Sequence, residues 1–221
     1  MITFEIQDKS IELAEYSDDA ALNELVGALE DFRLQNGLKT RNCRGCGKCC
    51  KDNIPVLGLD LPVIPGGLAS VEEGEPGSCI VLPEKPDLEA RRKALTELRR
   101  TNGLTELEAA LIYEYNNSEP LILSRQQGGA CLFLKNRLCS VYGRRPYSCG
   151  LYLCNMGEKL SYIQEMIIRQ GTWHAYHLLG WVSAEEISHN PFLKASSYDE
   201  LLVKDFDFGL ENALEQLFFY F

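Results

Sequence analysis

The sequence predicts a mainly α-helical protein with irregular cysteine-rich metal-binding segments and a small β-hairpin. Three observations predict this fold class: apolar residues recur at helical spacing in several segments, a Pro- and Gly-rich stretch interrupts them, and most of the nine cysteines lie in dense groups. With 221 residues, the chain is long enough to bury a core without disulfide staples. We expect one domain, with an N-terminal helical part (1–38), a cysteine-rich metal-binding part with inserted helices (39–157) and a C-terminal helical part (158–221).

The N-terminal half of the chain predicts a strand, a helix and then an irregular segment. Apolar and polar residues alternate within residues 1–10, which predicts a short strand. A helix is expected from Ser17, its N-cap, to Asn36, with Gly37 as its stop. Residues 52–86 are rich in Pro and Gly, so they exclude a long helix and predict an ordered, irregular loop.

Two helices and a hairpin are expected in the middle of the chain. The helices cover residues 87–100 and about 105–115, and the second begins with the capping-box pattern Thr-Glu-Leu-Glu. Residues 132–134 and 138–142 flank a polar turn, a pattern typical of a β-hairpin.

The C-terminal part is again predicted to be helical. One helix is expected from Glu158 to about Trp181, interrupted at Gly171, and a capping box follows at residues 183–186. A final helix is expected over residues 210–219.

The composition of the chain indicates which classes of partner to expect and in which cellular compartment the protein works. The net charge of −10 argues against nucleic-acid binding and against docking on anionic membranes. No apolar run approaches the ~18 residues of a membrane span, and the N-terminus lacks the pattern of a signal peptide. We therefore expect a cytoplasmic protein. An odd number of cysteines in a reducing compartment indicates metal or redox chemistry rather than disulfides.

The cysteines form two groups of four, with Cys79 outside both. The first group is a C-x2-C-x2-C-C array, whose spacing lets successive thiolates turn onto one metal centre. The alternatives are that some of these cysteines are small buried apolar residues or form disulfides. The candidate metal ligands are Cys43, Cys46, Cys49, Cys50, Cys131, Cys139, Cys149 and Cys154.

Positive charge surrounds both groups. Residues 39–51 and 120–157 each hold five basic residues and no acidic one, although the whole chain is acidic. Positive charge lowers the pKa of a thiol and offsets the charge of several thiolates on one metal. Arg44 and Arg145 are the candidate cofactor-binding cations, and Pro146 should hold Arg145 in an extended conformation. The alternative is that these residues are only solvated surface charges.

The ordered motifs resemble the CxxCxxCC family of zinc- or iron-chelating proteins, and the array is similar to that of the flagellin lysine methylases. The resemblance covers about residues 41–56 and 128–154. It rests on Cys43-x2-Cys46-x2-Cys49-Cys50, on Cys131-x-Phe133-Leu134, and on Cys139-Ser140-Val141-Tyr142-x2-Arg145-Pro146-x2-Cys149. In the methylases the array is associated with an iron–sulfur cluster, so the resemblance implies either a metal-binding module or a cluster-dependent group-transfer enzyme.

The spacing favours a [4Fe–4S] cluster, with a zinc or iron ion as the alternative. Three closely spaced cysteines and one remote cysteine are typical ligands of such a cluster, whereas paired zinc knuckles usually show two separated C-x2-C pairs. We expect Cys43, Cys46 and Cys49 to bind with one thiolate of the second group. The side chains of adjacent residues diverge, so Cys49 and Cys50 are not expected to bind the same small ion, and one of the two is expected to serve a second site or to be a reactive thiol.

Other functional signals are weak. His174 and His177 share a helical face, either as metal ligands or as packing residues, and His189 is expected in a loop. The sequence lacks the nucleotide-binding and hydrolase motifs that would indicate those enzymes. We therefore expect a module that transfers electrons or metal to a protein partner; the alternatives are a group-transfer enzyme and a structural zinc protein. The sequence predicts no oligomeric state.

Overall fold

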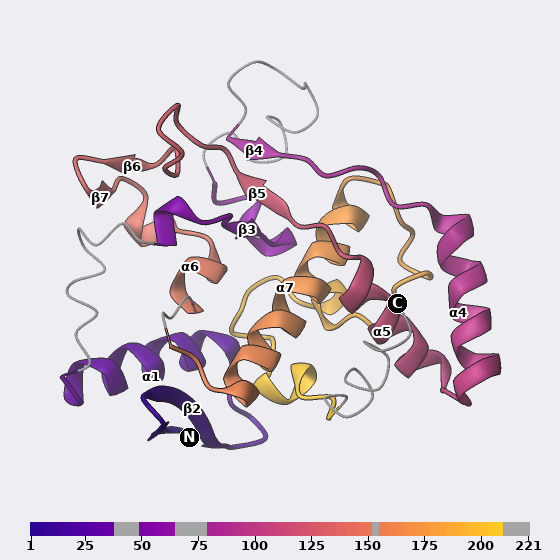
Figure 1. Cartoon of the computed structure of the whole chain (residues 1–221), viewed down its shortest axis with the longest axis horizontal. Coiled ribbons are helices and arrows are strands. Elements are labelled where there is room, and N and C mark those ends of the chain that lie inside the picture. The colour runs from indigo at the N-terminus through magenta and orange to yellow at the C-terminus, as the bar shows by residue number, and fades with distance from the viewer. Residues whose placement is uncertain (38–48, 65–78, 152–154, 210–221) are drawn as a thin grey trace.

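The computed structural model describes residues 1–37, 49–64, 79–151 and 155–209 (Figure 1). The long helix α7 (Glu158–Leu178) runs through the middle of this part of the chain. The other helices are α1 (Leu22–Gln35), α4 (Leu88–Asn102), α5 (Glu106–Asn117) and the short α6 (Tyr147–Leu151). The strands are β1 (Ile2–Gln7), β2 (Ser10–Tyr16), β3 (Pro55–Val56), β4 (Ile80–Val81), β5 (Leu121–Leu123), β6 (Leu134–Lys135) and β7 (Leu138–Cys139).

The fold class is mixed rather than mainly α, because small antiparallel sheets join the helices. The predicted strand at the N-terminus is one half of a hairpin, in which β1 pairs with β2. The turn between them places Asp8 and Lys9 at φ values of 46° and 73°. Gly, Asn and Asp adopt this left-handed conformation more readily than Lys does, so Asp8 followed by Lys9 is a weaker turn signal than Asp followed by Gly.

Helix α1 begins later than the sequence predicts. Its N-cap is Ala21, not Ser17, and Glu24 accepts a hydrogen bond from the Ala21 backbone N–H. The Ser17 hydroxyl instead accepts a hydrogen bond from the N-terminal amine of Met1 at 2.6 Å. Gly37 follows the helix at a φ of 60°, as expected for a stop.

The Pro- and Gly-rich segment contributes two strands to a sheet. Strands β3 and β4 both pair antiparallel with β5, in the order β3-β5-β4. The segment is irregular as predicted in its described parts, but its short strands are fixed by a partner about 40 to 65 residues later in the chain. Local pattern therefore did not predict this sheet.

The predicted helices of the middle segment are confirmed. Asp87 caps α4 by accepting hydrogen bonds from the backbone N–H groups of Glu89 and Ala90, and Gly103 ends it in the left-handed conformation. Thr105 and Glu108 form the capping box of α5. The predicted hairpin is confirmed as β6-β7.

Helix α7 connects two hydrophobic cores. Its N-terminal half adds Ile163 and Ile167 to a core with α1 and the β1-β2 hairpin, and its C-terminal half adds Trp173 and Tyr176 to a core around the three-stranded sheet. The predicted interruption at Gly171 is wrong, since α7 is continuous there. A Cβ at that position would lie 2.9 Å from Leu57 Cβ, so glycine serves close packing.

Two further expectations concern the C-terminal part. Ser183 and Glu186 exchange the hydrogen bonds of a capping box, but they open a run of turns rather than a helix. The helix expected over 210–219 lies outside the described residues. None of the helices in the described ranges combines the length and apolarity needed to cross a membrane.

Candidate metal centre

The structure describes part of the candidate ligand set. Cys43, Arg44, Cys46 and Cys154 lie outside the described residues, as does the side chain of Cys49. The remaining candidates and the lone cysteine of the irregular segment are thiols, and they are Cys50, Cys79, Cys131, Cys139 and Cys149.

A backbone hydrogen bond joins the two cysteine groups. Cys131 N–H donates to the carbonyl oxygen of Cys50 at 2.6 Å, although 80 residues of sequence separate them. Strand β5, which precedes Cys131, pairs with β3 directly after the array, and Leu123 N–H donates to Ile54 O at 3.0 Å. The start of the second group is therefore held against the end of the first.

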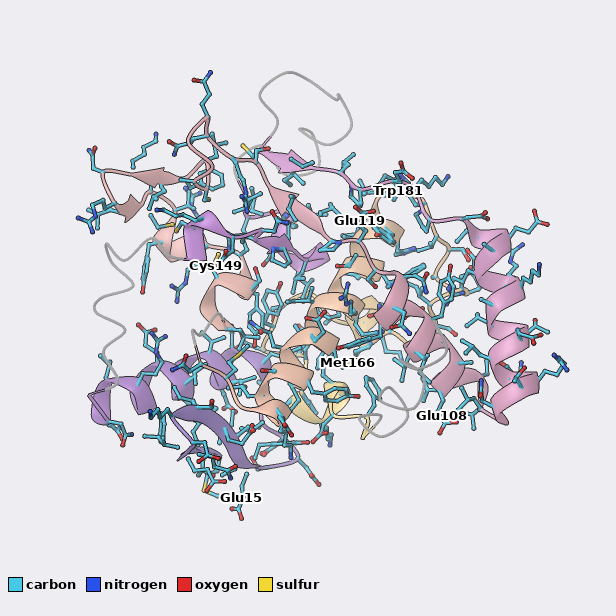
Figure 2. The ribbon with its side chains drawn as sticks, in the orientation of Figure 1. Glu15, Glu108, Glu119, Cys149, Met166 and Trp181 are labelled. Carbon is cyan, nitrogen blue, oxygen red and sulfur yellow. The ribbon has the colours of Figure 1, made fainter. Side chains whose placement is uncertain are left out.

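Helix α6 carries Cys149 to the same region. Its first backbone N–H, from Tyr147, donates to Asp60 Oδ1 at 3.0 Å, and Ser148 Oγ donates to Pro55 O at 2.6 Å. Both acceptors lie in the segment that follows the array. Figure 1 shows α6 between α1 and this segment, and Figure 2 shows Cys149 on it. Hydrogen bonds that involve the side chains of Asp60 and Ser148 thus hold a third cysteine-bearing element against the segment that follows the array.

Cys139 and Cys79 border this arrangement. Cys139 lies in β7 and pairs with Leu134 of β6. The carbonyl oxygen of Cys79 accepts a hydrogen bond from Ser124 N–H at 2.8 Å, and the Ser124 carbonyl accepts one from Leu132 N–H at 3.0 Å. The Cys79 backbone therefore lies beside the chain that leads into the second cysteine group, a placement that sequence motifs did not indicate.

The donor chemistry suits a soft metal. Cys131 is buried, while Cys50 and Cys149 are half-buried and pack against the core around the three-stranded sheet. Thiolates in such a partly apolar setting are ligands of zinc and of iron–sulfur clusters. Within the described ranges, no three His, Cys, Asp or Glu side chains are arranged to hold a metal ion. A complete ligand set therefore has to draw on the cysteines of the array or on Cys154.

Arg145 lies between the cysteines of the second group and has the predicted conformation. Its φ of −70° and ψ of 150° are extended, and Pro146 follows. Its guanidinium carbon lies 4.4 Å from the centre of the Tyr142 ring. No acidic side chain among the described residues forms an ion pair with Arg144 or Arg145, so both charges are available to an anionic group.

The histidines pack in the fold and do not form a metal site among the described residues. His174 is buried, stacks on Phe192 at 5.7 Å and lies against Gly58. Burial, and secondarily the proximity of His177, lower the pKa of His174 to about 4, so its imidazole is neutral at physiological pH. His177 Nδ1 lies 3.1 Å from the carbonyl oxygen of Val182. The packing interpretation fits both side chains.

A buried ionic cluster under α7 was missed by the sequence analysis. Glu114 is fully buried and contacts Arg91 at 2.7 Å, Gln170 at 2.9 Å and His189 at 3.0 Å. Arg91 also donates to the carbonyl oxygen of Glu186 at 2.9 Å. The cluster ties α4, α5, α7 and the following turns together. Its helical residues gave no signal, because acidic and basic side chains on helices are usually solvated.

Comparison with known proteins decides the family. A model of the CxxCxxCC family, described as "putative zinc- or iron-chelating domain", matches residues 42–167, which is more than half of the chain. The chain belongs to the CxxCxxCC family. The match spans the array, the three-stranded sheet and the second cysteine group, so the resemblance drawn from the motifs is confirmed.

Membership of the CxxCxxCC family indicates chelation of zinc or iron, but it does not indicate which reaction, if any, the protein catalyses. The family description names zinc or iron and no substrate. The same comparisons found no significant match to the chain among curated proteins or among solved structures. The geometry around Cys50, Cys131 and Cys149 is therefore the basis for a more specific function.

Proposed function

We propose that this CxxCxxCC protein holds an iron–sulfur cluster in the cytoplasm and transfers electrons, or the metal itself, to a protein partner. The cluster would be bound by Cys43, Cys46 and Cys49 together with one thiolate of the second group. The [4Fe–4S] form is favoured by the array spacing, with a single zinc or iron ion as the alternative.

One observation carries the proposal: the hydrogen bond from Cys131 N–H to Cys50 O, which joins the first cysteine of the second group to the last cysteine of the array. Three short-spaced cysteines supply only part of a four-thiolate set, so a remote cysteine must reach them. The bonds of Tyr147 to Asp60 and of Ser148 to Pro55 bring α6 to the same segment. Cys131 and Cys149 are accordingly the strongest candidates for the fourth ligand.

The surrounding residues support a charged thiolate centre. The apolar core behind Cys131 excludes water from one side, which stabilises metal–thiolate bonds against hydrolysis. Arg145 lies in the same segment and has no acidic partner among the residues described, so it can offset thiolate charge. A bound iron–sulfur cluster supplies one-electron redox chemistry.

Anaerobic purification followed by iron, sulfide and zinc analysis tests the proposal. We expect iron and acid-labile sulfide in equal amounts, visible absorption that bleaches on reduction, and a reversible one-electron couple. Zinc without sulfide would replace this proposal with the structural zinc protein. A monomer that holds no metal and titrates nine thiols would contradict metal binding altogether.

Matched serine variants identify the fourth ligand. Cys131→Ser and Cys149→Ser each remove a candidate thiolate, whereas Cys79→Ser removes a half-buried thiol outside the family motif. We expect the cluster to be lost in one of the first two variants and retained in the third. Binding of S-adenosylmethionine by the loaded protein would instead favour the group-transfer enzyme that the methylase resemblance implies.

A further inference from the structure

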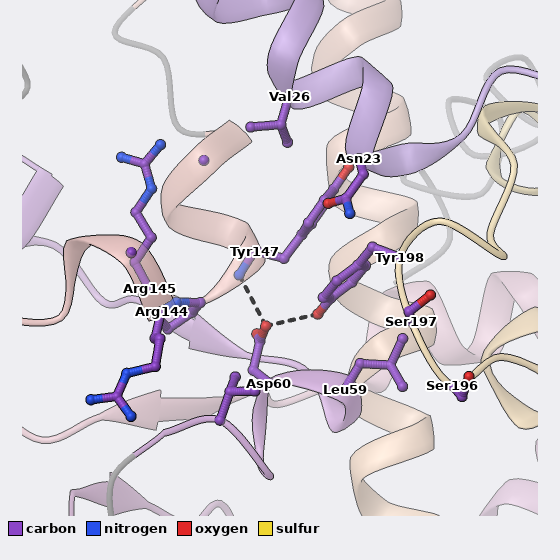
Figure 3. Close-up of a pocket in the computed structure, with 14 residues that line it drawn as sticks. Asn23, Val26, Leu59, Asp60, Arg144, Arg145, Tyr147, Ser196, Ser197 and Tyr198 are labelled. Carbon is purple, nitrogen blue, oxygen red and sulfur yellow. Dashed lines mark hydrogen bonds between the residues drawn. The ribbon is translucent and has the colours of Figure 1, made fainter.

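A cavity of about 440 Å³ lies beside the second cysteine group (Figure 3). Helix α1, the segment around η2 (Gly58–Asp60), the turn that leads into α6, and residues 196–198 line it. Its volume is within the ~300–1,000 Å³ range of small-molecule sites. Neither the family description nor the metal proposal assigns a role to it.

The floor of the cavity is rigid before any ligand binds. The rings of Tyr147 and Tyr198 stack with centroids 4.2 Å apart and an interplanar angle of 16°. Tyr198 donates its hydroxyl to Asp60 Oδ1 at 2.8 Å, and Tyr147 donates its hydroxyl to Leu22 O at 2.6 Å. Figure 3 shows the two bonds that Asp60 accepts from these tyrosines, one from the Tyr147 backbone N–H and one from the Tyr198 hydroxyl. Such a floor lowers the entropic cost of binding.

The acidic groups around the cavity are already engaged by protein donors. Asp60 is almost completely buried, and its two oxygens accept bonds from Tyr147, Tyr198 and Leu57 N–H. Two acids bind lining residues: Asp199 accepts a hydrogen bond from the Asn23 amide at 2.9 Å, and Glu200 accepts one from the Ser196 hydroxyl at 2.8 Å. These acids are held by hydrogen bonds to the protein.

The cationic groups are not engaged in the same way. Arg144 and Arg145 line the cavity on the side opposite Tyr198, and neither forms an ion pair with an acid in the described part of the chain (Figure 3). The two side chains diverge in Figure 3, so an oxyanion would meet one guanidinium, whose planar fork matches the geometry of a carboxylate or phosphate. Leu59 and Val63 supply apolar wall to the cavity, and Leu59 lies on the Tyr198 side (Figure 3).

We propose that this cavity binds a small organic anion, with its carboxylate or phosphate held by Arg144 and its apolar part against Leu59, Val63 and the ring of Tyr198. The site is separate from the cysteines, so it does not depend on which metal they hold. Its position on the segment between Cys139 and Cys149 places the ligand beside the chain that carries the second cysteine group.

Calorimetric titration of the full-length, metal-loaded protein tests the site with four probes: phenyl phosphate, benzoate, inorganic phosphate and uncharged benzyl alcohol. We expect saturable millimolar or tighter binding of phenyl phosphate, of benzoate or of both, and the tighter probe identifies the oxyanion. Inorganic phosphate should bind more weakly than phenyl phosphate, and benzyl alcohol should not bind.

Two variants address the charge and the space separately. Arg144→Gln removes one cation and should weaken anion binding about tenfold, since a charge-assisted hydrogen bond is lost. Val63→Trp places a large ring at a wall residue that is 46% exposed, so it should block binding with little effect on the core. Arg137→Gln changes an arginine of the β6-β7 turn and should bind the probes like the parent protein.

The outcomes are decisive in both directions. Loss of binding in Arg144→Gln and Val63→Trp, with unchanged metal content, supports the site. The inference is overturned if neither organic anion binds saturably, if both variants bind as well as the parent protein, or if inorganic phosphate binds as tightly as phenyl phosphate. Because metal content is measured on the same samples, failure of the anion site is distinguishable from failure of the metal proposal.

Discussion

Replacing Asp60 with asparagine should change how the stability of the protein depends on pH. Asp60 is only 1% exposed, and burial raises its pKa from the ordinary value of 3.8 to about 6, although three hydrogen bonds act in the opposite direction. Between these two values the folded protein binds a proton that the unfolded chain has released. The contribution of Asp60 to stability is therefore fully present below about pH 4 and falls as the pH rises to about 6.

The magnitude follows from the size of the pKa shift. A rise from 3.8 to about 6 corresponds to about 3 kcal/mol, at about 1.4 kcal/mol for each pKa unit. The asparagine side chain of Asp60→Asn cannot ionise, so the variant lacks this pH-dependent contribution. Its amide can still accept from Tyr147 and Tyr198 but loses the bond from Leu57 N–H, at a pH-independent cost of about 1–3 kcal/mol.

Urea unfolding of both proteins between pH 4 and pH 7 measures the effect. We expect the free energy of unfolding of the parent, minus that of Asp60→Asn, to decrease by about 2–3 kcal/mol over this range, because a small part of the full change lies below pH 4. Glu97→Gln is the control of opposite sign, because the hydrogen bond from Arg100 lowers the pKa of Glu97. A difference between parent and Asp60→Asn that stays flat, or that grows with pH, would refute the reasoning.

Three further substitutions, two of them paired with a control substitution, test particular contacts. Arg145→Gln should weaken metal retention at mildly acidic pH about 10–100-fold, while Arg92→Gln on α4 should leave metal retention unchanged. Metal analysis after dialysis measures both variants. Equal loss of metal in both would show that the positive charge near the cysteines is incidental. Glu114→Ala should lower the free energy of unfolding by about 3–5 kcal/mol, because it leaves a buried guanidinium without its carboxylate. Gly58→Ala should lower the free energy of unfolding by about 1–3 kcal/mol, because the new Cβ would lie 2.2 Å from His174 Nδ1. Gly27→Ala in α1 is its control: the new Cβ meets nothing within 4 Å, so this change should raise the free energy of unfolding by about 0.5–1 kcal/mol. Urea unfolding measures these stability changes, and similar effects at the two glycines would contradict the packing argument.

Helices and strands whose start and end are set by neighbouring residues could be predicted from the sequence. The helices α4 and α5 carry their own caps and stops, and Asp87, Gly103 and Thr105 act as their sequence pattern indicates. The hairpin β6-β7 was also found, because two largely apolar segments flank the polar residues 135–137, and the structure turns there at Asn136 and Arg137. In each case the determining contacts lie within a few residues of each other.

Elements that depend on distant contacts were not predictable. Strand β3 has only two residues and exists because β5 pairs with it, and the N-cap of α1 is set where the chain meets Leu201, whose carbonyl accepts from Leu22 N–H. The same limit applies to the candidate site. Cysteine spacing identified the candidate ligands, but the fixed position of α6 depends on Asp60, a carboxylate whose role appears only when the chain is folded.

Removal of the metal should leave most of the described fold intact. The segment after the array is held by the Cys131–Cys50 and Ser148–Pro55 hydrogen bonds and by β3-β5 pairing, and α7 joins two hydrophobic cores. None of these contacts uses a thiolate. The described fold therefore differs from that of small zinc fingers, which are unfolded without their metal.

We therefore expect chelation under reducing conditions to lower the melting temperature, because binding to the folded state alone adds stability. The far-ultraviolet circular dichroism of the helices should be retained at room temperature. Loss of the helical signal on chelation, with recovery on reloading, would show instead that the metal is required to create the fold. The first result would mean that the second cysteine group is positioned by the protein in advance, so that the metal binds to an existing framework and can be exchanged without unfolding.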